Sequence, residues 1–232
     1  MVVTPQDLLR RLDARLQDQQ SCAGRRYAAA LRNLVVAVRD APFADPAGPR
    51  AVTAFLVDRF LNAETATAER RPDDVPLPWR TALSVDPSST PPLRQLLVTA
   101  SAGINDDLPH ALLAQPGWDG TGSRADHETW TALMADAFAE AAAGSGSGAV
   151  DRALAVRERP LLRQTLLAAG AQAWRNAEDL RVHRESAGQD AFADRSRLLS
   201  ELTTGTFGEL LARGRLVAPR WRAVFVVGLG TA

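Results

Sequence analysis

Polar side chains interrupt the apolar faces of three predicted helices, and their types are suited to chemistry. Asn105 is the last of a series of residues that are spaced four apart on one helix face and begin with leucines, and Asp107 follows two residues later. Asn176 lies within the apolar face of a second helix, and Arg59 follows four residues after a phenylalanine on a third. Because an unpaired polar group costs free energy when it is buried, this convergence predicts a polar cavity shared by the three helices.

A carboxylate, several amides and an arginine form a set that fits an enzyme acting on a small polar molecule. A carboxylate whose pKa is raised by burial can act as a general base, and the candidates are Asp107 and Asp45. Amides would orient the substrate, and the planar fork of an arginine would hold an anionic group. The predicted substrate-binding residues are Arg59, Asn62, Asn105, Trp174, Asn176 and Glu178.

Each of these residues also has a purely structural interpretation. Asn105 and Asp107 could cap a helix that restarts after a kink, and Asp45 could stabilise a proline-rich turn. Arg59 could pair with a surface acid, and Asn176 could be a core amide with all its hydrogen bonds made. The functional interpretation therefore depends on whether the side chains meet.

The elements that must position these residues are helices separated by proline and glycine. Helices are predicted over about residues 5–16, 23–39, 50–70, 92–113, 126–138, 149–184 and 190–213. The predicted connections are the proline-rich loop 71–92 with a short helical turn at 79–83, the loop 115–124 and a flexible connector at 144–148. We expect Asp126 to cap the fifth helix, Pro109 to kink the fourth and Pro160 to interrupt the sixth.

No alternation of strands and helices is present, so a parallel sheet is not expected. The sequence predicts an all-α fold: a single domain over residues 1–232, built as a bundle of about seven helices with long proline-rich loops. Its core is expected at residues 5–213 and a tail at 214–232, where the short apolar stretch 223–229 could be a strand or an extended arm.

Composition excludes several classes of function. The 232 residues include 27 basic and 27 acidic side chains, and every basic one is arginine. The absence of lysine excludes Schiff-base chemistry and a phosphate-loop lysine, and the neutral balance gives no electrostatic basis for a nucleic-acid partner. Cys22 is the only cysteine, which excludes an intramolecular disulfide and a thiolate cluster. No dinucleotide, phosphate-loop or zinc motif is present, so we predict no cofactor and no metal.

The sequence predicts a cytoplasmic protein with a small-molecule substrate. No apolar run approaches the roughly 18 residues of a membrane span, so no membrane partner is expected. The first residues lack the basic and apolar regions of a signal peptide. A homodimer is compatible with the sequence.

Five short stretches occur together in an order that resembles a known family. They are Phe43–Pro46, Arg59–Ala63, Pro78–Arg80, Gly103–Pro109 and Ala173–Glu178. Over about residues 20–213 the chain resembles the bacterial helical family called domain of unknown function 5995. The most specific part is Ile104-Asn105 together with Asp107-Leu108-Pro109.

The chain departs from that family at two positions. The family usually has a histidine directly before the Ile–Asn pair, where this sequence has Gly103, and an arginine expected shortly before Trp174 is replaced at Gly170. If the family's histidine is a base or a ligand, the resemblance implies that this chain keeps the cavity but runs different chemistry.

A looser resemblance is to the protein that closes the azabicyclic, aziridine-containing ring in azinomycin-type antibiotic biosynthesis. It implies a cofactor-independent tailoring enzyme of specialised metabolism, a cyclase that forms a C–N bond with loss of an anionic group. The predicted residues fit such a reaction, since a base could take a proton from an amine while the anion leaves beside arginine.

Two other functions remain open. A non-catalytic protein that binds a small metabolite, for example in self-resistance, would use the same cavity. A metal-dependent helical hydrolase would use Asp107, His110 and a distant His127 or glutamate, and the absence of a histidine at Gly103 counts against it.

Overall fold

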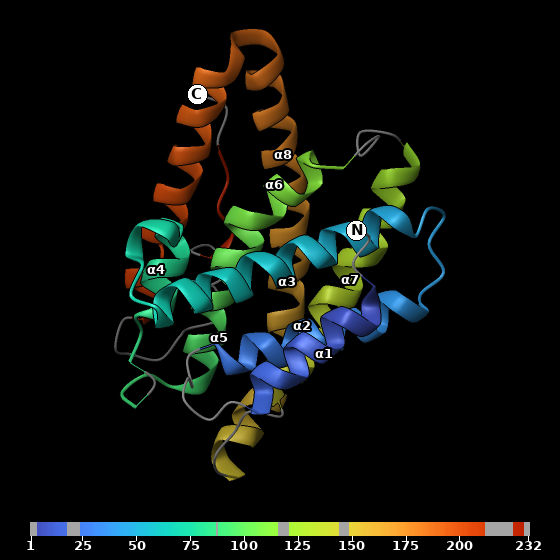
Figure 1. Ribbon diagram of the computed structural model, residues 1–232. Helices are drawn as coiled ribbons and strands as arrows, with labels where there is room; N and C mark the ends of the chain where they lie inside the picture. The colour runs from blue at the N-terminus through green and yellow to red at the C-terminus, as the bar shows by residue number, and fades with distance from the viewer. Residues whose placement is uncertain are drawn as a thin grey trace.

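The computed structural model describes residues 4–17, 24–86, 88–115, 121–143, 149–211 and 225–229. Its elements are α1 Pro5–Gln17, α2 Arg25–Asp40, α3 Ala47–Ala68, η1 Pro72–Asp74, α4 Leu77–Leu83, α5 Pro92–Ser101, η2 Ala102–Asp107, α6 Leu108–Leu113, α7 Thr121–Ala143, α8 Ala149–Gly205 and α9 Phe207–Leu211. All of these elements are helical and the described residues contain no strand, so the all-α prediction is confirmed (Figure 1). Cys22 and the predicted connector 144–148 lie outside the described residues.

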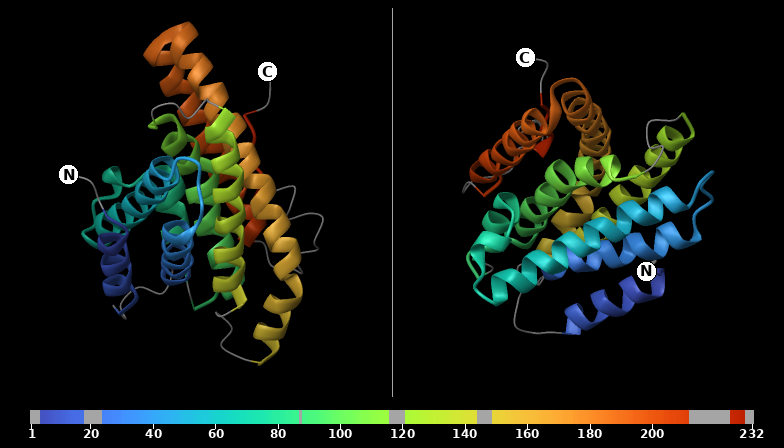
Figure 2. Two further views of the ribbon diagram at one scale, coloured as in Figure 1. Left: turned by 90° about the vertical axis from the view of Figure 1, so that its right-hand side faces the viewer. Right: turned by 45° about the horizontal axis from the view of Figure 1, so that its top comes forward.

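The centre of the bundle is a stack of three long helices. α7 packs against α2 on one side and α8 on the other, while α1 and α3 cover α2 (Figure 2). The α1 helix begins as its Thr4-Pro5 start predicts, because the Thr4 hydroxyl oxygen accepts the Asp7 amide at 3.2 Å. The leucines spaced four apart, Leu8 and Leu12, are buried. Apolar spacing therefore identified this interface correctly.

A π-helical segment, η2, connects α5 to α6 and makes residues 92–113 one continuous irregular helix. All six residues of η2 are buried. Pro109 lies just beyond it and has no N–H, so the Asn105 carbonyl cannot receive the usual α-helical bond from it. The predicted irregularity at Pro109 is thus present as a wider turn before the proline. Segments of this type are often found at functional sites.

Two predictions about the helices were wrong, the cap at Asp126 and the interruption at Pro160, whereas the predicted break between residues 184 and 190 is present at Gly188. Helix α7 begins at Thr121, so Asp126 lies inside it and does not cap it. Helix α8 continues through Pro160, and its break comes at Gly188, where φ is +86°. A positive φ of this size is easily adopted only by glycine, so Gly188 is where the chain reverses into a hairpin.

The apolar stretch at the end of the described chain is an arm held against the helices. Residues 226–229 have no regular secondary structure and lie beside α8, drawn in red in Figure 1. Phe225, Val227 and Leu229 are buried, whereas Gly228 between the last two is exposed. This part of the predicted tail therefore belongs to the packed core.

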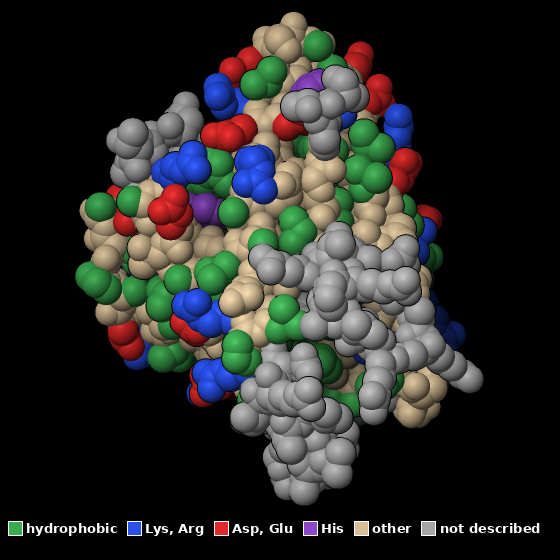
Figure 3. All heavy atoms as spheres, turned by 180° about the vertical axis from the view of Figure 1, so that it is seen from behind, with side chains coloured by type: hydrophobic (Ala, Val, Ile, Leu, Met, Phe, Trp, Pro, Cys, Tyr) green, Lys and Arg blue, Asp and Glu red, His purple; other side chains and the backbone are tan. Residues whose placement is uncertain are grey.

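The surface of the described residues is mixed in charge. Figure 3 shows arginine and acidic side chains interleaved over the back of the molecule, in the part of that face that is described. No described helix is both long enough and apolar enough to span a membrane.

Candidate functional site

Asp107 is enclosed by partners from two other elements. The Nε of Arg59 on α3 donates to its Oδ1 at 3.0 Å, and the indole nitrogen of Trp79 on α4 donates to its Oδ2 at 2.5 Å. The Asp107 side chain is 1% exposed, while that of Arg59 is 41% exposed. Arg59 thus pairs with a buried acid, and the two predicted site residues meet.

Burial dominates the electrostatics of this cluster. It raises the pKa of Asp107 to about 6, an effect that Arg59 opposes and the neighbouring carboxylate of Asp106 reinforces. Burial also raises the pKa of Asp106, against a hydrogen bond of 2.6 Å from the Ser200 hydroxyl and the nearby His110. Both oxygens of Asp107 accept hydrogen bonds and its side chain is 1% exposed, so a substrate could reach it only after neighbouring side chains move.

Tyr27 stands beside this cluster and was missed by the sequence analysis. It is fully buried, and its hydroxyl has no hydrogen-bond partner among the described residues. Its ring packs against Phe60, Trp79 and Phe138. A Cβ atom on Gly103 would lie 1.9 Å from the Tyr27 hydroxyl oxygen. The glycine at this position therefore makes room for the tyrosine, which a histidine side chain would displace.

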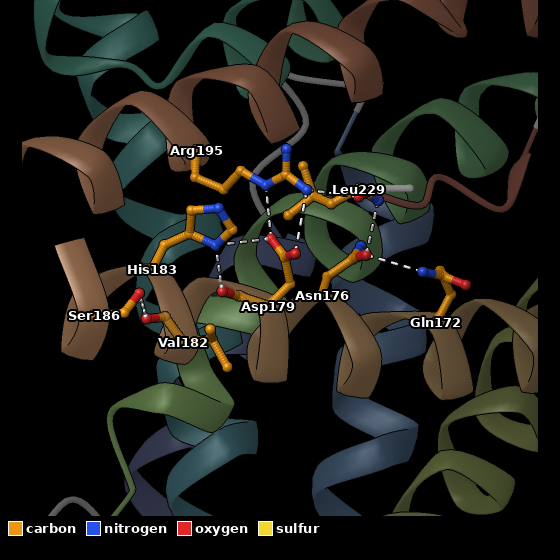
Figure 4. Close-up of polar contacts among 8 residues, drawn as sticks. All are labelled: Gln172, Asn176, Asp179, Val182, His183, Ser186, Arg195 and Leu229. Atoms are coloured by element: carbon orange, nitrogen blue, oxygen red, sulfur yellow. Dashed lines mark hydrogen bonds and ion pairs between the residues drawn. The ribbon is translucent and has the colours of Figure 1, made fainter. Parts of the chain in front are cut away.

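Asn105 and Asn176 both hold the C-terminal arm. Asn105 Nδ2 donates to the Phe225 carbonyl at 2.8 Å, and Asn176 Nδ2 donates to the Val227 carbonyl at 2.9 Å. The amides of Val227 and Leu229 donate back to Asn105 Oδ1 at 3.4 Å and Asn176 Oδ1 at 3.1 Å. Figure 4 shows Asn176 between Leu229 and Gln172. These two predicted substrate-binding amides are therefore occupied by the protein's own backbone.

The cavity expected from Asn62, Asn105, Asp107 and Asn176 is not assembled. Asn62 is exposed, Asp107 has its own partners, and the remaining two amides face the arm. The sequence identified buried polar groups correctly, except Asn62, but their partners come from distant parts of the chain. Spacing within a helix does not reveal such partners.

A different pocket contains two of the other predicted site residues, the carboxylate Asp45 and the aromatic Trp174. It encloses about 40 Å³, or about 440 Å³ when the adjoining open solvent is included, and lies between the start of α3 and helices α6, α7 and α8. Its polar and aromatic lining residues are Asp45, Gln115, Ser123, Asp126, His127, Trp130 and Trp174. Trp174 also donates to the Glu178 carboxylate at 2.8 Å, which places Glu178 behind the tryptophan. We call this hollow the α7–α8 pocket.

His127 is the buried polar group of the α7–α8 pocket. Its Nε2 lies 3.0 Å from the Gly170 carbonyl oxygen, and because a carbonyl only accepts, Nε2 carries the hydrogen. The lone pair is then on Nδ1, which has no partner among the described residues. Burial lowers the pKa of His127 to about 4, so the ring is neutral at pH 7.

Gly170 is needed for this arrangement. A Cβ atom there would lie 2.3 Å from a methyl carbon of Thr131. Gly170, which stands where the family pattern has an arginine, is therefore in direct contact with His127.

Two aspartates shape the mouth of the α7–α8 pocket. Buried Asp126 accepts the backbone amides of Ala44 at 2.9 Å and Asp45 at 2.8 Å, so it anchors the loop before α3. Asp45 is exposed, and its Oδ1 accepts the Ala47 amide at 3.0 Å. The turn-forming interpretation of Asp45 describes this contact, while the carboxylate remains part of the pocket lining.

The residues proposed for a metal-dependent hydrolase do not form a metal site. His110 contacts the Asp106 carbonyl at 2.7 Å and the Ser196 hydroxyl at 3.3 Å, whereas His127 faces the α7–α8 pocket. Within the described ranges, no three histidine, cysteine or acidic side chains are grouped so that they could hold a metal ion.

Comparison with known proteins places the chain in a family without assigning a reaction. The model described as "Family of unknown function (DUF5995)" matches residues 6–213, so the chain belongs to this family. The family resemblance seen in the sequence is confirmed and extends through α1. No curated protein and no solved structure matches the chain.

Proposed function

We propose that this member of a family of unknown function is an enzyme that transforms a small molecule in the α7–α8 pocket without a cofactor. The observation that carries the proposal is the meeting of Asp45, the neutral imidazole of His127 and the ring of Trp174 in one hollow. Such concave sites with a few converging polar groups are typical of small-molecule sites.

In this proposal Asp45 replaces Asp107 as the acting base. Asp45 uses only Oδ1 in its turn and is open to solvent, whereas both oxygens of Asp107 are occupied. His127 Nδ1 accepts a hydrogen bond from the substrate and orients it. The reaction we assign is intramolecular C–N ring closure. The ammonium form of the amine gives one proton to Asp45, the freed lone pair of the nitrogen attacks a carbon of the same molecule, and the bond from that carbon to the leaving group breaks with its electron pair.

The leaving anion has no arginine beside it in this pocket. Arg59, predicted for that role, holds Asp107 instead, and the described lining of the α7–α8 pocket includes no arginine. The anion would therefore leave through the open mouth of the pocket. We expect this chemistry in the cytoplasm and in specialised metabolism, and a neighbourhood of biosynthetic genes would support that setting.

The test uses sulfate esters of vicinal amino alcohols, whose ring closure yields an aziridine and inorganic sulfate. We expect sulfate release and a product lighter by the elements of sulfuric acid, detected by ion chromatography and mass spectrometry. Asp45→Asn should abolish turnover while its amide keeps the turn with Ala47. Asp86→Asn is the matched control, because Asp86 accepts the Ser88 amide in the same way outside the pocket.

Two outcomes would contradict the proposal. Full turnover by Asp45→Asn would remove the carboxylate from the mechanism. Tight binding of the esters without sulfate release would favour the second function, a protein that binds or sequesters a small metabolite in the same pocket.

A further inference from the structure

The charged residues that line the α7–α8 pocket are acidic, while Arg124 lies outside the lining but close enough to His127 to add to the lowering of its pKa by burial. Asp45 and Asp126 are its acidic lining residues, and none of the described lining residues is an arginine. Because the sequence contains no lysine, arginine and histidine are the only side chains that could carry a positive charge there. His127 does not supply one at neutral pH, since burial lowers its pKa to about 4.

The inner wall of the pocket is aromatic. The His127 ring centroid lies 4.9 Å from that of Trp174, and 6.2 Å from that of Trp130 with the two planes only 17° apart. The negative face of an indole ring attracts a cation, most strongly where water is excluded. Trp174 is 5% exposed and Trp130 is 1% exposed, so protein atoms, including the His127 ring, cover most of both rings, and only the small exposed part of Trp174 is open to a ligand.

From these features we infer that the α7–α8 pocket selects small organic cations, specifically molecules with a protonated or quaternary nitrogen. The cationic group lies against the ring of Trp174 and near the carboxylate of Asp45. An ammonium group also donates one N–H to His127 Nδ1, the ring nitrogen without a partner among the described residues. This inference deepens the proposed function, since an amine substrate would enter as its ammonium form.

Isothermal titration calorimetry on the full chain at pH 7 tests the charge preference. The probes are benzylamine, which is protonated at this pH, benzyltrimethylammonium, neutral benzyl alcohol and anionic benzoate. We expect both cations to bind at least about tenfold more tightly than benzyl alcohol, in line with a shielded cation–π contact, and benzoate not to bind. Equal affinities for benzylamine and benzyl alcohol, or no binding of either cation, would overturn the inference.

Two sets of variants locate the cation in the pocket. Trp174→Phe and Trp174→Leu should weaken benzyltrimethylammonium binding in that order, because phenylalanine keeps a weaker aromatic face and leucine keeps none. Asp45→Asn should weaken it about threefold, whereas Asp86→Asn should leave it unchanged. Equal affinities in the phenylalanine and leucine variants, both folded by circular dichroism, would rule out the ring contact.

The two proposals fail in different ways. Ring closure of neutral substrates without cation preference would overturn this inference and leave the enzyme proposal intact. Cation binding at Trp174 without turnover of any amino sulfate ester would support this inference and overturn ring closure.

Discussion

The ionisable residues buried in this bundle are perturbed in opposite directions. Asp107 has a pKa raised to about 6 because its negative form is desolvated, and His127 has a pKa lowered to about 4 because its positive form is desolvated. Both residues are therefore kept closer to their neutral forms than in water. The two differ in surroundings, since Asp107 is buried among its hydrogen-bond partners and His127 lines the α7–α8 pocket.

These opposite shifts predict how stability depends on pH. Below pH 6.5 the unfolded chain protonates His127 while the folded chain does not, so this residue lowers stability as the pH falls from 6.5 to about 4. Asp107 has the opposite effect, because the folded chain keeps the proton of this carboxyl up to about pH 6 while the unfolded chain loses it near pH 3.8. The contribution of Asp107 to stability therefore falls as the pH rises from 3.8 to about 6.

His127→Gln removes the first effect and leaves the second. We expect the stability of this variant to fall more steeply than that of the parent as the pH rises from 4 to 6. Urea unfolding at several pH values measures the difference. Identical slopes in the two proteins would show that His127 titrates normally in the folded state.

Among the elements, η2 places Gly103 against Tyr27 and thereby allows a buried ring at the centre of the bundle. Gly103→Ala should destabilise the protein by about 1–3 kcal/mol, because its Cβ would overlap the tyrosine hydroxyl. Tyr27→Phe removes the oxygen that is overlapped, together with a buried group that lacks a partner. The double variant should therefore lose less stability than the sum of the two single changes. Additive losses in a urea double-mutant cycle would contradict the direct contact.

The C-terminal arm is held by side-chain amides, which makes its attachment testable. Asn176→Ala removes the acceptor of the Leu229 amide, so hydrogen exchange at Leu229 should accelerate by about tenfold or more. Asn62→Ala is the matched control, since Asn62 is an exposed asparagine in α3. Unchanged exchange at Leu229 in Asn176→Ala would show that the arm is held by its apolar side chains alone.

The elements also show what the sequence could and could not predict. Apolar spacing located most of the long helices because burial follows the helical period, as at Leu8 and Leu12. Asp126 was wrongly predicted to cap a helix. In the sequence, an aspartate before an apolar run has the same pattern whether it caps that helix or, as here, accepts amides from a loop 81 and 82 residues earlier. The sequence analysis placed Asn105 and Asn176 on core-facing sides of their helices but assigned both to substrate binding, because their true partners lie 120 and 51 residues away and leave no local pattern.

At the scale of the whole molecule, Arg195 joins three segments. From the second arm of the α8 hairpin it reaches Asp179 on the first arm at 2.7 Å and the Leu229 carbonyl at 2.7 Å (Figure 4). Asp179 also lies 3.6 Å from His183. The Arg195 side chain is only 14% exposed, so this network is better shielded from solvent than the surface pairs.

Loss of Arg195 should therefore affect the overall melting temperature. Arg195→Ala leaves Asp179 and the Leu229 carbonyl without their donor, and we expect a decrease of about 3–8 °C in calorimetry. Arg197→Ala, which removes an exposed pair with Asp194 on the same arm, should change it by less than about 2 °C. Equal decreases in melting temperature in the two variants would indicate that removal of any arginine side chain from this helix, rather than loss of the Arg195 network, causes the effect.

The docking of residues 225–229 has a consequence for how the chain matures. On the ribosome these residues emerge after every helix that they contact. The side-chain amides of Asn105 and Asn176 therefore lack these hydrogen-bond partners while the rest of the bundle forms. A nascent chain halted before Phe225 would expose an unfilled apolar seam beside α8. Such intermediates are the species that chaperones bind and that aggregate when translation is slow.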